Sequence, residues 1–186
     1  MRKKAILLFL LFIGPEFSFS QQSDSVCSVK IPVLQVYIDR LNRIYVVNSS
    51  GIFQFNSECR QTASFTQRIT GGITSLDVSN PLKILVFAQA EQKIYLLDDR
   101  LHIQSAIPLS ELGIRQAVLV CNSRNDGFRV FDQATNKLIR FDYSLNRLQE
   151  NDLSTAFNKS FDPVMLAENE KILAISNRLS LIMVFD

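Results

Sequence analysis

The sequence is poor in the residues from which most catalytic and metal sites are built. Its 186 residues include a single histidine, His102, and no Cys-x-x-Cys, His-x-x-His or His-Glu-x-x-His spacing occurs. A catalytic or metal-binding histidine usually needs partners, so His102 is predicted to be a partly exposed turn residue. Neither a phosphate-loop motif nor a Gly-x-Ser-x-Gly motif is present. No catalytic, cofactor-binding or metal-binding residue is therefore predicted, and the chain is not expected to be an enzyme.

Two further shortages exclude classes of partner and anchor. Beyond the N-terminus, no apolar run is long enough to cross a bilayer, so no membrane span is expected in the mature chain. The N-terminal 20 residues carry three basic residues and one acidic residue, and without them the numbers of basic and acidic residues are equal. A neutral mature chain gives no reason to propose nucleic acid as a partner.

The first 20 residues have the layout of a secretory signal peptide. A basic start at 2–4 precedes an apolar run from Ala5 to Gly14, and small residues at Ser18 and Ser20 precede a cut ahead of Gln21. The run is short for a membrane helix, although an uncleaved anchor is the alternative. The sequence therefore predicts an exported protein, periplasmic or extracellular.

Four similar segments recur along the chain at a near-constant spacing. Each is a short apolar run closed by Asn56, Asp98, Asp142 or Asp186, and these closing residues lie 42, 44 and 44 positions apart. A second apolar run begins 8 to 10 residues before each segment, and polar residues suited to hairpin turns separate the two. β-Branched and aromatic residues dominate both sets, as is typical of strands.

A third strand is predicted before each pair, and a weaker fourth strand follows in three of the units. Four strands in about 40–45 residues is the period of a propeller blade. We therefore predict an all-β fold, a β-propeller-like array of about four antiparallel blades in a domain covering 21–186. The predicted blade units are 33–67, 73–109, 117–150 and 164–186.

The closing Asp or Asn is predicted to accept hydrogen bonds from backbone N–H groups two residues on and so to fix the next turn. Three residues later stand Cys59, Leu101 and Leu145. Because Cys59 shares this position with leucines, and Cys121 lies 44 residues before Met165, both cysteines are predicted to pack in the core. An odd number of cysteines, with Cys27 the third, leaves the disulfide state open.

The ends of the array admit two arrangements. In one, residues 28–33 supply an outer strand to the fourth unit and close a four-bladed ring. In the other, the sequence is the N-terminal part of a larger propeller that is truncated or completed by another chain. The second is favoured because an apolar terminus such as Leu181 to Phe185 is a poor exposed edge.

Part of the repeat resembles a known group of proteins. The stretch from Ile44 to Asn56 is similar to blades of NHL-like and related six-bladed propellers, and Leu76 to Phe87 and Asn125 to Gln133 resemble uncharacterised exported propeller-like proteins of Bacteroidetes-type bacteria. The resemblance implies export and a propeller longer than this one, and it implies no catalytic residue. The Trp-Asp signature of another propeller class is excluded because the chain has no tryptophan.

The function most consistent with these patterns is an exported, non-enzymatic binding or assembly module, whose partner is an unknown protein, peptide or glycan held by loops at one rim. The alternatives are an envelope hydrolase or lyase with a metal in the channel, and a truncated fragment of a longer propeller. Asp98-Asp99 and Asn122 to Asp126 are the densest oxygen-rich clusters. Both are interpreted as solvated turns. A few of the tyrosines are candidates to line a rim groove.

Overall fold

The structure is a computed structural model that describes residues 27–124, 126–154, 163–169, 172–177 and 182–185. The predicted signal peptide at 1–20 lies outside the described residues. The regular secondary structure of the described residues is almost entirely β-strand, with two short 3-10 turns, η1 (Gln89–Glu91) and η2 (Leu109–Leu112). The all-β prediction is therefore confirmed.

The strands form four antiparallel sheets, here called blades 1 to 4, each made of strands consecutive in the sequence. Blade 1 contains β1 (Gln35–Ile38), β2 (Ile44–Asn48), β3 (Gly51–Phe55) and β4 (Gln61–Phe65). Blade 2 contains β5 (Ser75–Asp77), β6 (Ile84–Ala88), β7 (Lys93–Leu97) and β8 (Ile103–Pro108). Blade 3 contains β9 (Ala117–Ser123), β10 (Gly127–Asp132), β11 (Lys137–Asp142) and β12 (Arg147–Asp152). Blade 4 contains β13 (Pro163–Glu168), β14 (Leu173–Asn177) and β15 (Ile182–Phe185).

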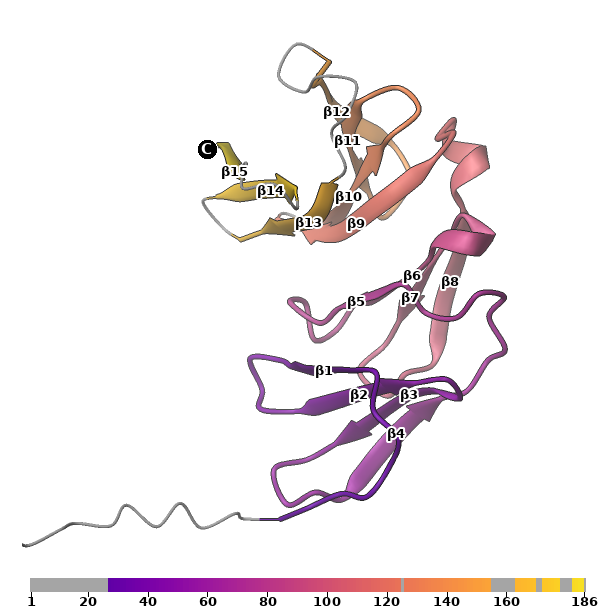
Figure 1. The fold of residues 1–186 in the computed structure, drawn as a ribbon, viewed down its shortest axis with the longest axis vertical. Helices are drawn as coiled ribbons and strands as arrows, with labels where there is room; N and C mark the ends of the chain where they lie inside the picture. The colour runs from indigo at the N-terminus through magenta and orange to yellow at the C-terminus, as the bar shows by residue number, and fades with distance from the viewer. Residues whose placement is uncertain (1–26, 125, 155–162, 170–171, 178–181, 186) are drawn as a thin grey trace, which may run out of the picture.

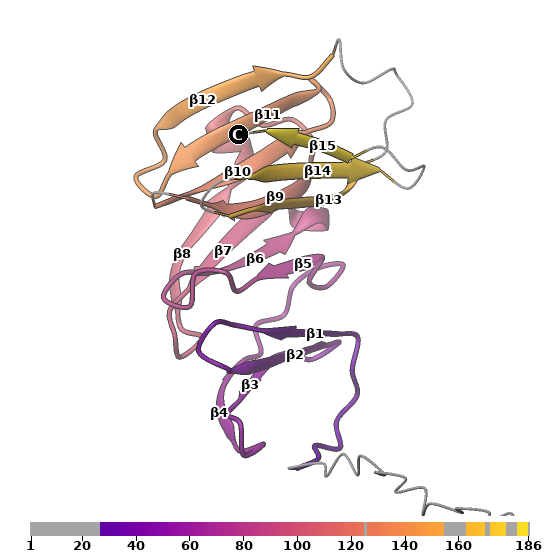
Figure 2. The same cartoon turned by 90° about the vertical axis from the view of Figure 1, so that its left-hand side faces the viewer.

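The blades follow one another in an open arc (Figure 1). Blade 1 lies at the bottom of that view and blade 4 at the upper left, and the first strands β1, β5 and β13 lie on the concave left-hand side. Figure 2 views this side and shows the same first strands stacked one above another. Each sheet runs from a first strand on the inside of the arc to a last strand on the outside.

Apolar side chains between neighbouring blades hold the arc together. Alternate residues of a strand point to opposite faces, so each blade buries both faces when it lies between two others. The core between blades 1 and 2 includes Tyr45, Ile52 and Tyr95, whereas the core between blades 2 and 3 includes Phe87 and Phe128. A third, smaller core joins blade 3 to blade 4. Because both faces of such a blade are buried, its strands are nearly continuous apolar runs in the sequence.

The turn into the outer strand has the same construction in three blades. Oδ1 of Asn56 accepts backbone N–H bonds from Glu58 and Arg60, at 3.0 and 2.9 Å. Asp98 accepts the equivalent pair from Arg100 and His102, both at 2.8 Å. In blade 3, Oδ1 of Asp142 accepts the backbone N–H of Asn146 at 2.8 Å. The predicted role of the closing Asp or Asn is therefore confirmed in these three blades, and Asp186 lies outside the described residues.

The position three residues after the closing residue is a left-handed turn position. Cys59, Leu101 and Leu145 have φ of 59°, 63° and 69°, and the strand register shifts by a bulge beside each turn. Leu101 is buried, whereas Leu145 is exposed. The backbone conformation, and not burial, is thus what the three positions share.

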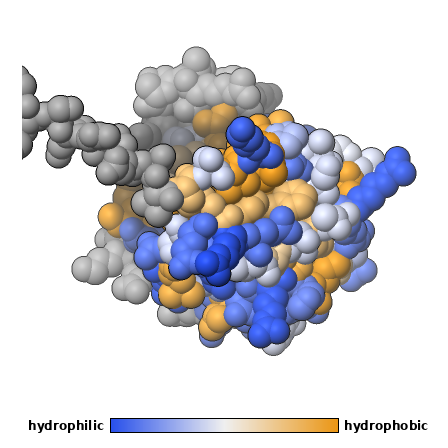
Figure 3. Space-filling view, turned by 90° about the horizontal axis from the view of Figure 1, so that it is seen from below, coloured by the Kyte–Doolittle hydropathy of each residue, from blue (hydrophilic) through white to orange (hydrophobic). Residues whose placement is uncertain are grey.

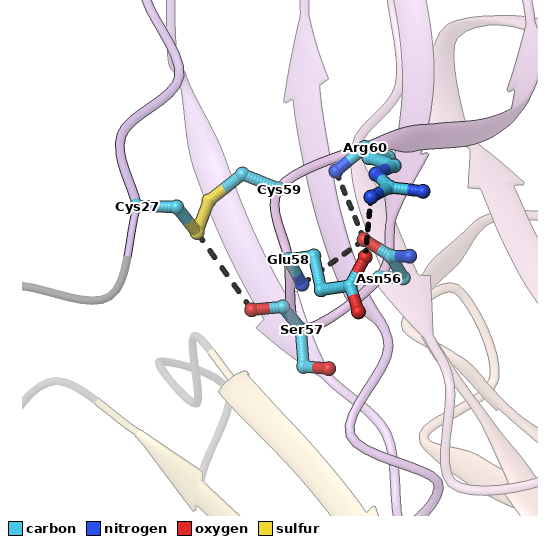
Figure 4. The surroundings of a disulfide bond; sticks show 6 residues. All are labelled: Cys27, Asn56, Ser57, Glu58, Cys59 and Arg60. Carbon is cyan, nitrogen blue, oxygen red and sulfur yellow. Dashed lines mark hydrogen bonds and ion pairs between the residues drawn. A yellow bond between two sulfur atoms is a disulfide. The ribbon is translucent and has the colours of Figure 1, made fainter.

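The two cysteine predictions have different outcomes. Cys121 is buried in the core between blades 3 and 4, as predicted. Met165, which stands 44 residues later, is exposed and does not repeat that role. The core assignment of Cys59 is wrong, because Cys59 forms a disulfide with Cys27 (Figure 4). The bond ties the segment before β1 to the turn between β3 and β4.

One of the two closing arrangements conflicts with the structure. Residues 28–33 form no strand, and the disulfide holds their N-terminal end beside blade 1. The expectation that they complete blade 4 and close a four-bladed ring is therefore wrong.

Candidate functional site

In all four blades, the first turn, which joins the first and second strands, contributes to the same polar cleft. Blade 1 supplies Arg40, blade 2 supplies Ser79 and Asn80, and blade 4 supplies Glu168 and Asn169. The remaining lining residues come from blade 3: Asn122, Ser123, Arg124 and Asp126. The cleft has a volume of about 390 Å³. We call it the first-turn cleft, and all its lining residues lie within three residues of the end of a first strand.

The wall between blades 2 and 3 is fixed by hydrogen bonds that cross from blade to blade. Oδ2 of Asp77 accepts the backbone N–H of Asn122 at 2.8 Å, and the side-chain amide of Asn122 donates to the carbonyls of Asp77 and Lys83, both at 3.3 Å. Tyr143 donates its hydroxyl proton to Oδ1 of Asn122 at 3.2 Å. Asn122 is thus a buried structural residue that sets the position of the neighbouring Ser123.

The wall between blades 3 and 4 is built on a buried ion pair. Nε of Arg129 donates to Glu168 at 2.6 Å, and both side chains are almost completely buried. Arg124 also lies within 3.7 Å of Glu168 and is more exposed. A buried pair of this kind fixes geometry strictly, because removing one partner leaves an uncompensated charge. The carboxylate of Glu168 therefore has a structural role, which is to hold blade 4 against blade 3.

Ser123 offers the cleft an unused hydrogen-bonding group. Its side chain is buried, with 9% of the residue exposed, and its Oγ has no hydrogen-bond partner within the described part of the chain. A buried hydroxyl without a partner costs about 1–3 kcal/mol. A ligand that supplies a donor or acceptor at this point would remove that cost.

The cleft carries charges of both signs at its mouth. Arg40 and Asp126 are exposed, and they come from blades 1 and 3. Asn80 and Asn169 present amides whose Oδ1 atoms accept backbone N–H groups within their own turns. The cleft is therefore suited to a ligand with alternating donors and acceptors, more than to one of a single charge.

Of the two oxygen-rich clusters, one lines the cleft and the other lies away from it. Residues 122–126, apart from Asn125 outside the described residues, contribute to the first-turn cleft. Asp98 and Asp99 lie in the turn between β7 and β8. Burial alone would raise the pKa of Asp98, but backbone N–H bonds from His102 and Arg100 outweigh it and lower that pKa. Among the described residues, no group of three or more His, Cys, Asp or Glu side chains is placed to hold a metal.

The structure places the single histidine where the sequence predicted it. His102 lies in the turn into β8, its side chain is 73% exposed, and Nδ1 lies 3.3 Å from Asp98. It does not line the first-turn cleft. None of the four tyrosines lines the cleft, and two of them, Tyr45 and Tyr95, are buried between blades 1 and 2. The suggestion that tyrosines line a rim groove is wrong for this cleft.

Arg40, Ser79 and Asn169 were not identified from the sequence as candidate residues. Each lies in an ordinary polar turn, and only the relative placement of the blades brings them together. The repeat itself is the sequence feature that points to them, since they occupy equivalent turns. Within the described ranges, no helix is long and apolar enough to span a membrane.

Comparison with known proteins identifies the fold and nothing narrower. No family model matches the chain, and no curated protein matches its sequence. Among solved structures, it is similar to the Neurospora crassa Pan2 WD40 domain, with a TM-score of 0.59, 11% identity, and coverage of 83% of this chain and 46% of that one. The chain has a β-propeller fold.

Two further solved structures that resemble this chain are of proteins of different kinds. BBS1N, solved in complex with ARL6DN, gives a TM-score of 0.58 at 13% identity over 81% of this chain and 50% of that one. Virginiamycin B lyase from Staphylococcus aureus gives 0.57 at 11% identity over 76% of this chain and 47% of that one. The propeller described here thus spans about half the length of the structures it resembles.

Proposed function

We propose that this propeller is an exported, non-enzymatic module that binds an extended peptide segment of a partner protein in the first-turn cleft. The observation that carries the proposal is the convergence of equivalent turns from all four blades on one polar cleft. Loops on a rigid scaffold are where binding residues concentrate. The unpartnered hydroxyl of Ser123 adds a hydrogen-bonding group that a ligand would satisfy.

The lining residues favour a peptide over a glycan. Among the described residues, no aromatic side chain lines the cleft, so none of them offers a ring there to stack on a sugar. Amide and hydroxyl groups with exposed charges of both signs, from Arg40, Arg124 and Asp126, suit a peptide main chain, which presents donors and acceptors at regular intervals. The likeness to BBS1N, solved in complex with ARL6DN, agrees with a binding role for this fold.

A channel-metal lyase has less support. A variant of virginiamycin B lyase in which a histidine is replaced by alanine is described as catalytically inactive. The single histidine of this chain, His102, is exposed in an outer turn of blade 2 and lies outside the cleft. Tightly bound Ca²⁺ or Zn²⁺ in the purified protein would favour a lyase over a binding module.

Export is proposed on two observations. The N-terminal 20 residues have the signal-peptide layout, and the Cys27–Cys59 disulfide is of a kind that persists in oxidising compartments. Expression of the full chain in a bacterium should yield a periplasmic product whose N-terminus is Gln21. A product that keeps residues 1–20 in the cytoplasm would contradict export.

The binding proposal is tested with a matched pair of charge reversals. Peptides are selected from a random display library on residues 21–186, and their affinities are measured for the parent, for Arg40→Glu and for Arg60→Glu. Arg60 is an exposed arginine in the turn before β4, outside the cleft. We expect Arg40→Glu to weaken binding by about tenfold or more and Arg60→Glu to leave it unchanged. Equal effects of both variants would contradict the proposal, as would a library that yields no binding peptide.

A further inference from the structure

Each blade has a backward face, which we define as the sheet face that looks toward the preceding blade. In blade 2, six large apolar side chains lie on this face. All six belong to the core between blades 1 and 2: Leu76, Val78, Ile84, Val86, Tyr95 and Leu97. Lys93, which pairs with Ala88 at the end of the same face, is half-buried. The centre of the backward face of blade 2 is thus apolar and packs on blade 1.

Blades 3 and 4 use the equivalent positions in the same way. In blade 3, Val120, Val130 and Ile139 pair across the sheet and lie in the core against blade 2. In blade 4, Leu166 and Ile175 pair and lie in the core against blade 3. The backward face is therefore a repeated packing surface whose partner, in three cases out of three, is the forward face of another blade.

Blade 1 carries the same surface, and its inner part is exposed. By register its backward face consists of Val36, Ile38, Ile44, Val46, Phe53 and Phe55. Val46 and Phe55 are buried, but Val36 and Ile38 on the first strand are 54% and 65% exposed, whereas the equivalent Leu76 and Val78 are 4% and 6% exposed. Figure 3, which views the molecule from the blade 1 end, shows apolar side chains gathered across this surface.

The forward face of blade 4 is the complementary surface at the other end of the arc. Met165 is exposed, Ala167 and Ala174 pair across the sheet, and Val184 pairs with Ala174 and is exposed. None of these residues is charged, so packing this face against another apolar face buries no unpaired charge. Exposed apolar faces of this kind mark interaction sites.

We propose that the backward face of blade 1 packs on the forward face of blade 4 in a second copy of this chain, and that the same contact repeats to close a two-fold ring of eight blades. A head-to-tail contact generates a closed ring when its rotation closes. Eight blades lie within the four to eight typical of propellers. The chain spans about half the length of the propellers it resembles, which agrees with a ring built from two copies.

The first test is the mass of the mature chain in solution, measured by light scattering on a size-exclusion column. We expect twice the mass of one chain for the parent and the mass of one chain for Val36→Asp with Ile38→Asp. Leu148→Asp is the matched control, because Leu148 is an exposed residue of the outer strand β12; this variant should remain a dimer. A monomeric parent at every concentration would overturn the proposal, as would a charged variant that stays dimeric with an unchanged circular dichroism spectrum.

The second test identifies which faces meet. Val36→Cys and Met165→Cys chains, each carrying a different tag, are mixed and oxidised. The ring predicts a disulfide between a Val36→Cys chain and a Met165→Cys chain. Cross-linking of Val36→Cys chains only to one another would indicate a contact between two copies of blade 1 and would overturn the head-to-tail arrangement. Cross-linking in neither mixture would also overturn it.

Discussion

The side chain of Asp39 fixes a turn and makes the stability of that turn depend on pH. Its Oδ1 accepts backbone N–H bonds from Leu41 and Arg43, and its Oδ2 accepts a bond of 2.7 Å from Nε of Arg43. Tyr45 donates its hydroxyl proton to the same Oδ2, at 3.0 Å. Burial would raise the pKa of Asp39, but these bonds outweigh it and lower the pKa below its ordinary value of 3.8.

The lowered pKa predicts a loss of stability in acid. The stabilisation is fully present above the unfolded value near 3.8 and is lost as the pH falls through the lower folded value. Asp39→Asn should reduce the unfolding free energy at neutral pH by roughly 1–3 kcal/mol and should flatten its decline below about pH 4. Urea unfolding across this range measures both effects. An Asn variant with the same acid-dependent decline as the parent would contradict the role assigned to Asp39.

The disulfide gives a second prediction at this scale. Cys27 and Cys59 are 32 residues apart, and closing a loop of that length stabilises a fold by roughly 3–4 kcal/mol through the entropy of the unfolded chain. Replacing both cysteines by serine should lower the unfolding free energy by up to that amount. The parent in reducing buffer should match the variant. Identical stability of the parent and variant under oxidising conditions would show that the bond does not form.

Sequence reasoning succeeded for residues whose role is local and failed for those whose partner is distant. The role of Asn56 and Asp98 was predictable because each side chain bonds backbone groups within four residues. Cys59 was misassigned because its equivalence to Leu101 reports the backbone of the turn. The position of Cys27 beside that turn depends on the path of the preceding segment, which no local pattern records.

At the scale of elements, the recurring apolar runs located every described strand. Predicted and observed units differ mainly at their ends, as with β12 (Arg147–Asp152), which extends beyond the predicted unit 117–150. Leu145 has a left-handed backbone (φ 69°) and belongs to the turn. The blade pattern was predictable because each strand buries side chains on a face toward a neighbouring blade, which keeps the runs apolar and their spacing regular.

The packing between blades predicts a clear contrast between two substitutions. Phe141 is 2% exposed and stacks on Phe128 with ring centroids 5.5 Å apart, between blades 2 and 3. Phe141→Ala should therefore reduce the unfolding free energy by about 3–5 kcal/mol. His102→Ala, in an exposed turn, should change it by less than about 0.5 kcal/mol. Chemical denaturation compares the two, and a larger loss at His102 than at Phe141 would contradict the assignment of the repeat.

At the scale of the whole molecule, the first-turn cleft was only partly foreseeable. The sequence marked Asn122 to Asp126 as a polar cluster, but it gave no reason to connect this cluster with Arg40 or Asn169. Those residues lie far apart in the chain and meet because successive blades curve into an arc (Figure 1). The curvature follows from how sheet faces pack, and a strand pattern contains no information on it. A rim binding site was predicted as a class, without its residues.

The most direct test of the account is a distance measurement between spin labels attached at cysteines introduced in blades 1 and 4. Arg40 and Asn169 line the same cleft, whereas Ser49 lies at the opposite end of β2, one strand length of roughly 15 Å away. The account predicts a shorter distance for the pair 40 and 169 than for the pair 49 and 169. A distance for 40 and 169 equal to or longer than that of the control pair would show that the first turns do not converge, and the proposed cleft would not exist.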